Sequence, residues 1–225
     1  MANHLDLEEQ EQLDQLKHFW NQYGNLITWV LIVVLGAVAA WNGYQYWQSR
    51  QAAQAAVMYD EVEKVARSGD VEKAQRAFND MKDRFAGAAY TQQSALLLAR
   101  MAYDAGKTDV AKESLTWLAA HAKDDGLAAL AKLRLAAILL EAKSYEEALK
   151  LLQAFPAAFE GLAADRRGDI YSQQGKVNEA KAEYLKAYKA TDAQAPYRRI
   201  LAVKLNTLGV DPEADSKSGK PGGAS

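Results

Sequence analysis

Residues 168–187 read GDIYSQQGKVNEAKAEYLKA, and this stretch decides the expected fold. Its small residues Gly168 and Ala180 are spaced so that two antiparallel helices could approach closely. Gly175, between them, suits the left-handed conformation that ends a helix. Tyr184 follows one turn after Ala180 and is large enough to fill the groove between successive helix pairs. The stretch therefore predicts a helical hairpin that turns at Gly175.

Three earlier segments repeat this arrangement at regular spacing. In each, a break residue stands five positions before a small residue and nine before a large apolar one. The alanines that correspond to Ala180 give spacings of 37, 37 and 32 residues along the chain. Lys143 stands at the third break, where the other segments have glycine. The positions expected to pack the repeats are Gly69, Ala74, Phe78, Gly106, Ala111, Leu115, Ala136, Ala148, Leu152, Gly168, Gly175, Ala180 and Tyr184.

The pattern resembles the tetratricopeptide repeat, a helical hairpin of about 34 residues. This resemblance implies an all-α solenoid over residues 48–209, with about four hairpins and a closing helix at Pro196–Leu208. Irregular loops are expected near Phe85–Ala89 and Lys123–Gly126. The apolar stretch Leu127–Leu140 is too short for a second membrane span and predicts a buried helix. An alanine-rich bundle without solenoid curvature is the alternative.

An uncharged stretch near the N-terminus predicts a transmembrane helix. Residues 18–49 contain no Lys, Arg, Asp or Glu, and Leu26–Trp41 reads LITWVLIVVLGAVAAW. We place the span at residues 23–47. A cleaved signal peptide fits poorly because the preceding segment is acidic, and a buried soluble helix would seldom carry aromatic residues at both ends. The expected membrane-interface anchors are Trp20, Tyr23, Trp41, Tyr44 and Trp47.

The two ends of the chain differ in composition from the repeats. Residues 1–17 hold five acids against Lys17 alone, and Leu13, Leu16, Trp20 and Tyr23 have helical spacing. We expect residues 1–22 to form an acidic cytoplasmic tail with a short interfacial helix, either solvated or bound to a basic partner. Residues 210–225 are rich in Gly, Ser and Pro with charges, which predicts disorder.

The sequence contains no recognisable set of catalytic residues. It has three histidines, no cysteine, and none of the phosphate-binding, zinc or nucleophile motifs. We therefore expect no enzyme activity, cofactor or metal site, and the net charge of -2 gives no basic surface for nucleic acid. Binding would then use the concave face, at Tyr59, Glu63, Leu96, Arg100, Tyr103, Leu130, Leu133, Leu140, Asp165 and Asp169, unless these residues form inter-repeat core.

The order of these parts is similar to that in the ancillary subunit of the bacterial SecYEG translocon, the YfgM family. The similarity rests on LKHFWNQYGN, on WNGYQYWQSRQAA at the end of the span, and on the start of the repeats, YDEVEKVARSGD. It implies a bacterial inner-membrane protein with a cytoplasmic N-terminus and periplasmic repeats. The implied partners are the SecYEG translocon, a membrane-anchored periplasmic chaperone of the peptidyl-prolyl isomerase type, and exported client proteins.

Two other functions are compatible with the same sequence. One is a membrane-anchored scaffold for an envelope assembly complex, in cell division or outer-membrane biogenesis. The other is an adaptor whose repeats face the cytosol. The basic residues lean slightly toward a cytoplasmic repeat domain and do not decide the orientation, since Lys17 precedes the span and Arg50 follows it, with Lys64 and Arg67 further out.

Overall fold

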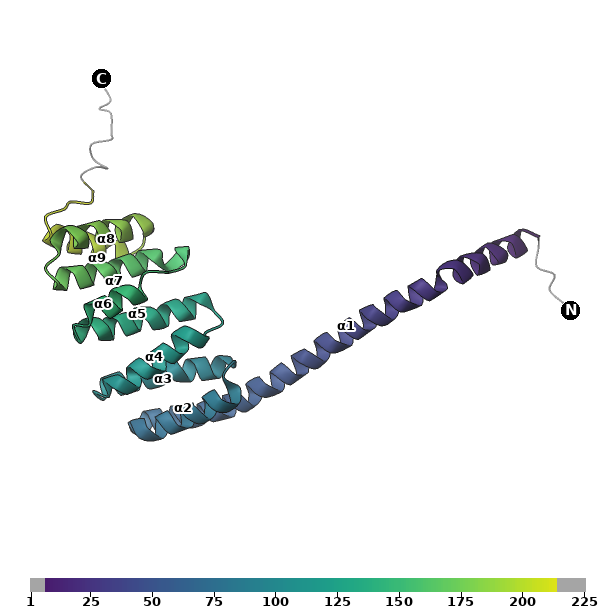
Figure 1. Ribbon diagram of the computed structural model, residues 1–225, viewed down its shortest axis with the longest axis horizontal. Coiled ribbons are helices and arrows are strands. Elements are labelled where there is room, and N and C mark those ends of the chain that lie inside the picture. Colours follow the sequence, from purple (N-terminus) through teal and green to yellow (C-terminus); the bar gives the residue numbers. More distant parts are fainter. Residues whose placement is uncertain (1–6, 214–225) are drawn as a thin grey trace, which may run out of the picture. The chain divides into compact units, whose positions relative to one another are not determined.

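The computed structural model describes residues 7–213, and every regular element among them is helical (Figure 1). The all-α fold class predicted from the sequence is therefore confirmed for this part of the chain. The chain divides into two compact units, Met1–Ala53 and Gln54–Ser225. The predictions for residues 1–6 and for the tail after Glu213 lie outside the described residues.

The first unit consists of the N-terminal part of α1, which runs from Leu7 to Ser68. The sequence predicted a short helix before the span, and the structure instead continues one helix from Leu7 through the apolar stretch. No proline interrupts this region, and the carbonyl of Gly24 accepts a hydrogen bond from the Thr28 hydroxyl at 2.7 Å. The predicted tail helix and the predicted span thus belong to the same element.

Helix α1 is the one helix among the described residues that is long and apolar enough to cross a membrane. Its apolar side chains from Leu26 to Trp41 are largely exposed. In water this exposure would be unfavourable, since each buried CH₂ is worth about 0.8 kcal/mol. A bilayer would cover the same side chains.

The second unit stacks four helical hairpins and a closing helix, as the sequence predicted (Figure 1). The C-terminal part of α1 pairs with α2 through a cluster that includes Val62, Met81 and Phe85. The other hairpins are α3 with α4, α5 with α6, and α7 with α8, and α9 packs against α8. Their bounds are α2 Val71–Phe85, α3 Ala89–Asp104, α4 Thr108–His121, α5 Asp125–Glu141, α6 Tyr145–Leu151, α7 Glu160–Gln173, α8 Val177–Ala190 and α9 Tyr197–Thr207.

The four break residues adopt the left-handed backbone conformation. Their φ angles are 77° at Gly69, 73° at Gly106, 59° at Lys143 and 73° at Gly175. In the last three hairpins the turn is closed in the same way, as where the Lys107 N–H donates to the carbonyl of Ala102 at 2.7 Å. These bonds satisfy carbonyls that a helix end would otherwise leave without a partner.

The core lies where the hairpins cross. The four alanines at the crossing positions are fully buried, and so, nearly, are the large apolar residues that follow them by one turn, namely Phe78, Leu115, Leu152 and Tyr184. Gly168 faces Tyr184 so closely that a Cβ on Gly168 would lie 2.5 Å from the ring. Small residues therefore set the distance between paired helices, as expected for close antiparallel packing.

Irregular segments occur at the two places that the sequence predicted, and a longer one occurs where none was predicted. The connections at residues 86–88 and 122–124 are short, because long helices such as α5 take up the extra length of these repeats. The longer irregular connection follows α6, which ends at Leu151 and is joined to α7 through the 3-10 helix Ala157–Phe159. Helix α5 contains the predicted buried stretch, with Ala131, Ala136 and Leu139 in the core.

Candidate partner-binding face

The first helices of the hairpins form a face that contains three successive pockets. The α1–α3 pocket has a volume of about 480 Å³, the α3–α5 pocket about 380 Å³, and the α5–α7 pocket about 520 Å³. These volumes lie within the range of about 300–1,000 Å³ that is common for ligand pockets. All three are formed within the second unit.

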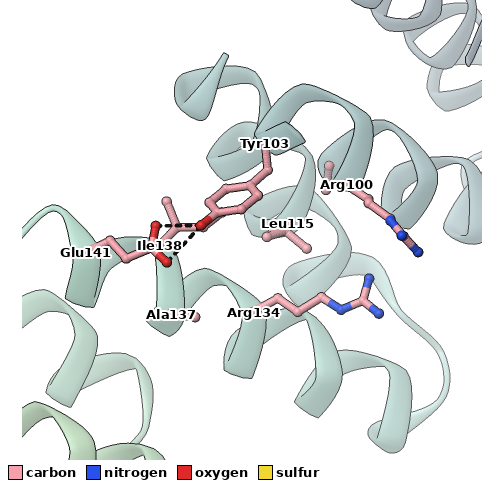
Figure 2. Close-up of a pocket in the computed structure, with 8 residues that line it drawn as sticks. Arg100, Tyr103, Leu115, Arg134, Ala137, Ile138 and Glu141 are labelled. Atoms are coloured by element: carbon pink, nitrogen blue, oxygen red, sulfur yellow. Dashed lines mark hydrogen bonds between the residues drawn. The ribbon is translucent and has the colours of Figure 1, made fainter. Parts of the chain in front are cut away.

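The α3–α5 pocket has an apolar floor and charged ends (Figure 2). Leu115 of α4 and Ile138 of α5 form the floor and are almost fully buried. Arg100 of α3 and Arg134 of α5 stand at one end, as Figure 2 shows. The pocket therefore combines an apolar surface with two cationic side chains.

The opposite end of this pocket is closed by a hydrogen bond between two helices. The Tyr103 hydroxyl of α3 lies 2.7 and 2.8 Å from the two carboxylate oxygens of Glu141 of α5 (Figure 2). Donation to this carboxylate raises the pKa of Tyr103. Glu141 is thus already engaged, and its negative charge makes this end unfavourable for an anion.

The α5–α7 pocket borders a polar cluster that holds the closing helix. Lys204 of α9 donates to Asp165 at 2.8 Å and to Asp169 at 2.6 Å, both on α7. The hydroxyls of Tyr184 and Tyr197 donate to Asp169 and Asp165, respectively. Burial raises the pKa of both tyrosines above the usual value, and their carboxylate partners raise it further. Asp165 is only 4% exposed and fully engaged, so it binds α9 rather than an external ligand.

A second buried charge joins α6, α7 and α8. The guanidinium of Arg167 donates to the Leu152 carbonyl at 2.8 Å, to Glu160 at 2.6 Å and to Glu183 at 2.9 Å. Lys186 also donates to Glu160 at 2.6 Å. Sequence reasoning missed this cluster, because its members are separated in the chain and have no motif in common.

The predicted concave-face residues divide into two groups. Glu63, Arg100, Tyr103, Leu140 and Asp169 line the three pockets. The others are engaged within the fold or half-buried on it: Tyr59, whose ring lies 5.6 Å from that of Tyr90, and Leu96, Leu130, Leu133 and Asp165.

Sequence reasoning also missed both charged residues that α5 contributes to the α3–α5 pocket, Arg134 and Glu141. The repeat pattern gave no signal for the first, since the local spacing of 37 residues aligns Arg100 with Ala137 and not with Arg134. Leu133 was predicted in its place. The error of one position on a helix corresponds to a rotation of about 100°, which separates a core residue from a pocket residue.

The aromatic residues expected at the membrane interface are exposed within the first unit. They are Trp20, Tyr23, Trp41, Tyr44 and Trp47, and the last two have ring centroids 6.2 Å apart. Rings of this kind concentrate at headgroup level. Their role as anchors stays a prediction.

Within residues 7–213 no three His, Asp or Glu side chains gather at metal-binding distance. His121, at the end of α4, has its Nδ1 atom 2.8 Å from the Trp117 carbonyl and its ring stacked on Trp117, with centroids 4.9 Å apart. This is a local contact at a helix C-terminus, where an imidazole pairs favourably with free carbonyls.

Comparison with known proteins identifies the family. The tetratricopeptide repeat-like domain matches residues 17–210. The ancillary SecYEG translocon subunit of Neisseria gonorrhoeae is 32% identical over 213 residues, which cover 92% of this chain and all of that protein. Proteins of the same name from Aggregatibacter actinomycetemcomitans and Escherichia coli K12 are 28% and 24% identical, each over 90% of this chain and 98% and 97% of their own lengths. The resemblance seen in the sequence is confirmed, and the chain belongs to the tetratricopeptide repeat-like family of ancillary SecYEG translocon subunits.

Proposed function

We propose that this protein is an accessory subunit of the Sec translocon, anchored in the bacterial inner membrane by α1, and that it acts by binding other proteins rather than by catalysis. The observation that carries the proposal is the relative from Neisseria gonorrhoeae, which matches over its full length and is named an ancillary SecYEG translocon subunit. The apolar part of α1 supports a membrane location.

The proposed topology has a cytoplasmic N-terminus and a periplasmic repeat domain. Charge gives little guidance, because one basic residue, Lys17, lies near the span on the N-terminal side and one, Arg50, on the other. Alkaline phosphatase, which is active only in the periplasm, can be fused after Leu208. We expect an active fusion. An inactive phosphatase, together with an active cytosolic reporter at the same position, would reverse the orientation.

The repeat domain is proposed to bind a membrane-anchored periplasmic chaperone of the peptidyl-prolyl isomerase type and exported client proteins. Its first-helix face offers three successive pockets, two that combine apolar surface with charged side chains and one that is mainly polar, which suits protein segments better than one small molecule. In this arrangement the anchor keeps the face near the translocon, and the chaperone receives the client there. The effect of this tethering is a high local concentration of the chaperone and the client protein.

Affinity purification of the full chain from gently solubilised native membranes tests this function. We expect SecYEG and a chaperone of the stated type to be the dominant partners. A matched control carries the same repeat domain on an unrelated apolar span, which separates capture through the membrane helix from capture through the repeats. Division or outer-membrane assembly proteins as dominant partners would favour the scaffold alternative and contradict the proposal.

A further inference from the structure

The α3–α5 pocket contains two arginines, of which, within the described part of the chain, one has no ion-pair partner and the other has only an exposed one. Among residues 7–213, Arg134 forms no hydrogen bond or ion pair. The nearest carboxylate to Arg100 is that of Asp104, with 3.7 Å between Nε and Oδ2 and with both side chains more than half exposed. Exposed pairs of this kind contribute little to stability. Both guanidinium groups are therefore available to a ligand.

The two ends of the pocket carry opposite charge. At the arginine end, two planar guanidinium groups could each hold a carboxylate through paired N–H donors. At the other end, Glu141 repels an anion and already accepts from Tyr103. Between the ends, Leu115 and Ile138 offer an apolar floor for a neighbouring side chain. A carboxylate and an apolar group at adjacent positions would match this arrangement.

The surface continues beyond the arginine end. Arg100 lines both the α3–α5 pocket and the α1–α3 pocket, where Leu97 and Met101 add further apolar surface. A bound chain would therefore have room to pass the arginines instead of ending at them. This favours an acidic side chain within a segment over the carboxylate at a protein's C-terminus.

We propose that the α3–α5 pocket binds a partner-protein segment that carries an internal Asp or Glu side chain against Arg100 and Arg134 and an apolar side chain over Leu115 and Ile138. This inference rests on the proposed function and deepens it by naming the chemistry of the bound segment. It assigns Arg134 and Ile138, which the sequence patterns did not single out, to recognition.

Peptide binding to the full-length protein in nanodiscs of neutral lipid tests the assignment. The probes are a fluorescent Ser-Gly-Leu-Glu-Phe-Leu-Gly-Ser with an amidated end, the same peptide with Gln for Glu, and a Gln-containing peptide that ends after Phe in a free carboxylate. We expect the Glu peptide to bind about tenfold more tightly than either Gln peptide, as for one well-formed charge-assisted contact. Empty nanodiscs give the background.

Variants locate the contact on the protein. The double substitution Arg100→Ala with Arg134→Ala is expected to remove the preference for Glu, and Arg134→Lys to retain part of it, because lysine keeps the charge without the fork. Arg76→Ala, an exposed arginine of α2 that lines none of these pockets, is the matched control and should leave binding unchanged. Circular dichroism confirms that each variant is folded.

Three results would overturn the assignment. They are equal binding of the Glu and Gln peptides, a preference for Glu that survives the double substitution, and binding of the free-carboxylate peptide alone. The assay contains no translocon. A negative result in the peptide assay would therefore contradict only the proposed role of the pocket. Whether the protein associates with the translocon is tested separately by the purification described above.

Discussion

Single residues decide where each helix of the repeat domain ends and how closely the helices pack. The left-handed turns at Gly69, Gly106 and Gly175 carry no Cβ, whereas Lys143 adopts the same conformation at φ 59° with a full side chain. A Cβ in this region costs about 1–2 kcal/mol relative to right-handed conformations. The third hairpin therefore turns at an energetic cost that the other three avoid.

Replacing Lys143→Gly is expected to stabilise the repeat domain by about 1 kcal/mol, because glycine adopts the left-handed conformation without a steric penalty. Denaturant unfolding of the full chain in detergent, followed by circular dichroism, measures the change. Lys181→Gly, within α8, is the matched control and should destabilise by about 1 kcal/mol. A destabilised Lys143→Gly protein would show that the side chain contributes more than its backbone strain costs.

Replacing Gly168→Ala is expected to destabilise the fourth hairpin by about 1–3 kcal/mol, since the added Cβ would lie 2.5 Å from the Tyr184 ring. The unfolding free energy of Gly168→Ala is compared with that of Gly168→Ala combined with Tyr184→Leu, which restores space. The two substitutions should couple, with the double variant losing less than the sum of the single losses. Additive losses would contradict the proposed close contact.

At the scale of elements, α7 holds together the helices at the C-terminal end of the solenoid. Through Arg167 it holds α6 and α8, and through Asp165 and Asp169 it holds α9. Terminal repeats of a solenoid lack a neighbour on one side, so they depend on such added contacts for stability.

Lys204→Met is expected to weaken the docking of α9 by about 2 kcal/mol, because it leaves the buried Asp165 without a cation and leaves Asp169 paired with Arg166 alone. Hydrogen exchange of amides in Tyr197–Thr207 should then become about thirtyfold faster. Lys189→Met, on the exposed side of α8, serves as control and should not change this exchange. Unchanged protection of α9 in Lys204→Met would show that apolar packing alone holds the helix.

The Arg167 cluster predicts a pH dependence. Partial burial would raise the pKa of Glu160, but hydrogen bonds from Lys186 and Arg167 outweigh it and hold the pKa below its ordinary value of 4.5. A carboxylate with a lowered pKa stabilises the fold above its unfolded-state pKa, and this stabilisation is lost as the pH falls through the folded value.

Glu160→Gln should therefore destabilise the protein by about 1 kcal/mol at pH 7, and the difference from wild type should shrink below about pH 4.5. Unfolding curves at pH 7, 5 and 3.5 measure it. Asp109→Asn, which affects an exposed pair with Lys112, is the control and should change stability little at any of these values. A difference that stays constant with pH would contradict the ionic role of Glu160.

The sequence predicted the elements better than the contacts among them. Small residues at fixed spacing identify hairpins, because close helix approach excludes large side chains at Ala111 or Ala148 whatever surrounds them. The pockets depend on helix rotation, and there a shift from Arg134 to Leu133 was enough to misplace a residue. Asp165 is unavailable to a ligand because Lys204, 39 residues away in the sequence, donates a hydrogen bond to it. No local sequence pattern predicts that pairing.

At the scale of the whole molecule, one helix contributes both to the membrane anchor and to the repeats. Helix α1 contains the uncharged stretch and also Val62, which lies in the core of the first hairpin. No glycine or proline occurs between Tyr44 and Ser68. The sequence between the proposed anchor and the repeats thus contains no glycine- or proline-rich linker.

The most direct test of the account is photocrosslinking in living cells from the anchor. A photoreactive residue is placed in turn at each position of Ile32–Leu35, which together cover one helical turn. The account predicts that at least one position forms an adduct with a SecYEG subunit, and that this adduct disappears when residues 24–46 are replaced by an unrelated apolar span that keeps the photoreactive residue at the same position. Absence of a translocon adduct from all four positions, with the protein intact in the membrane, would contradict it.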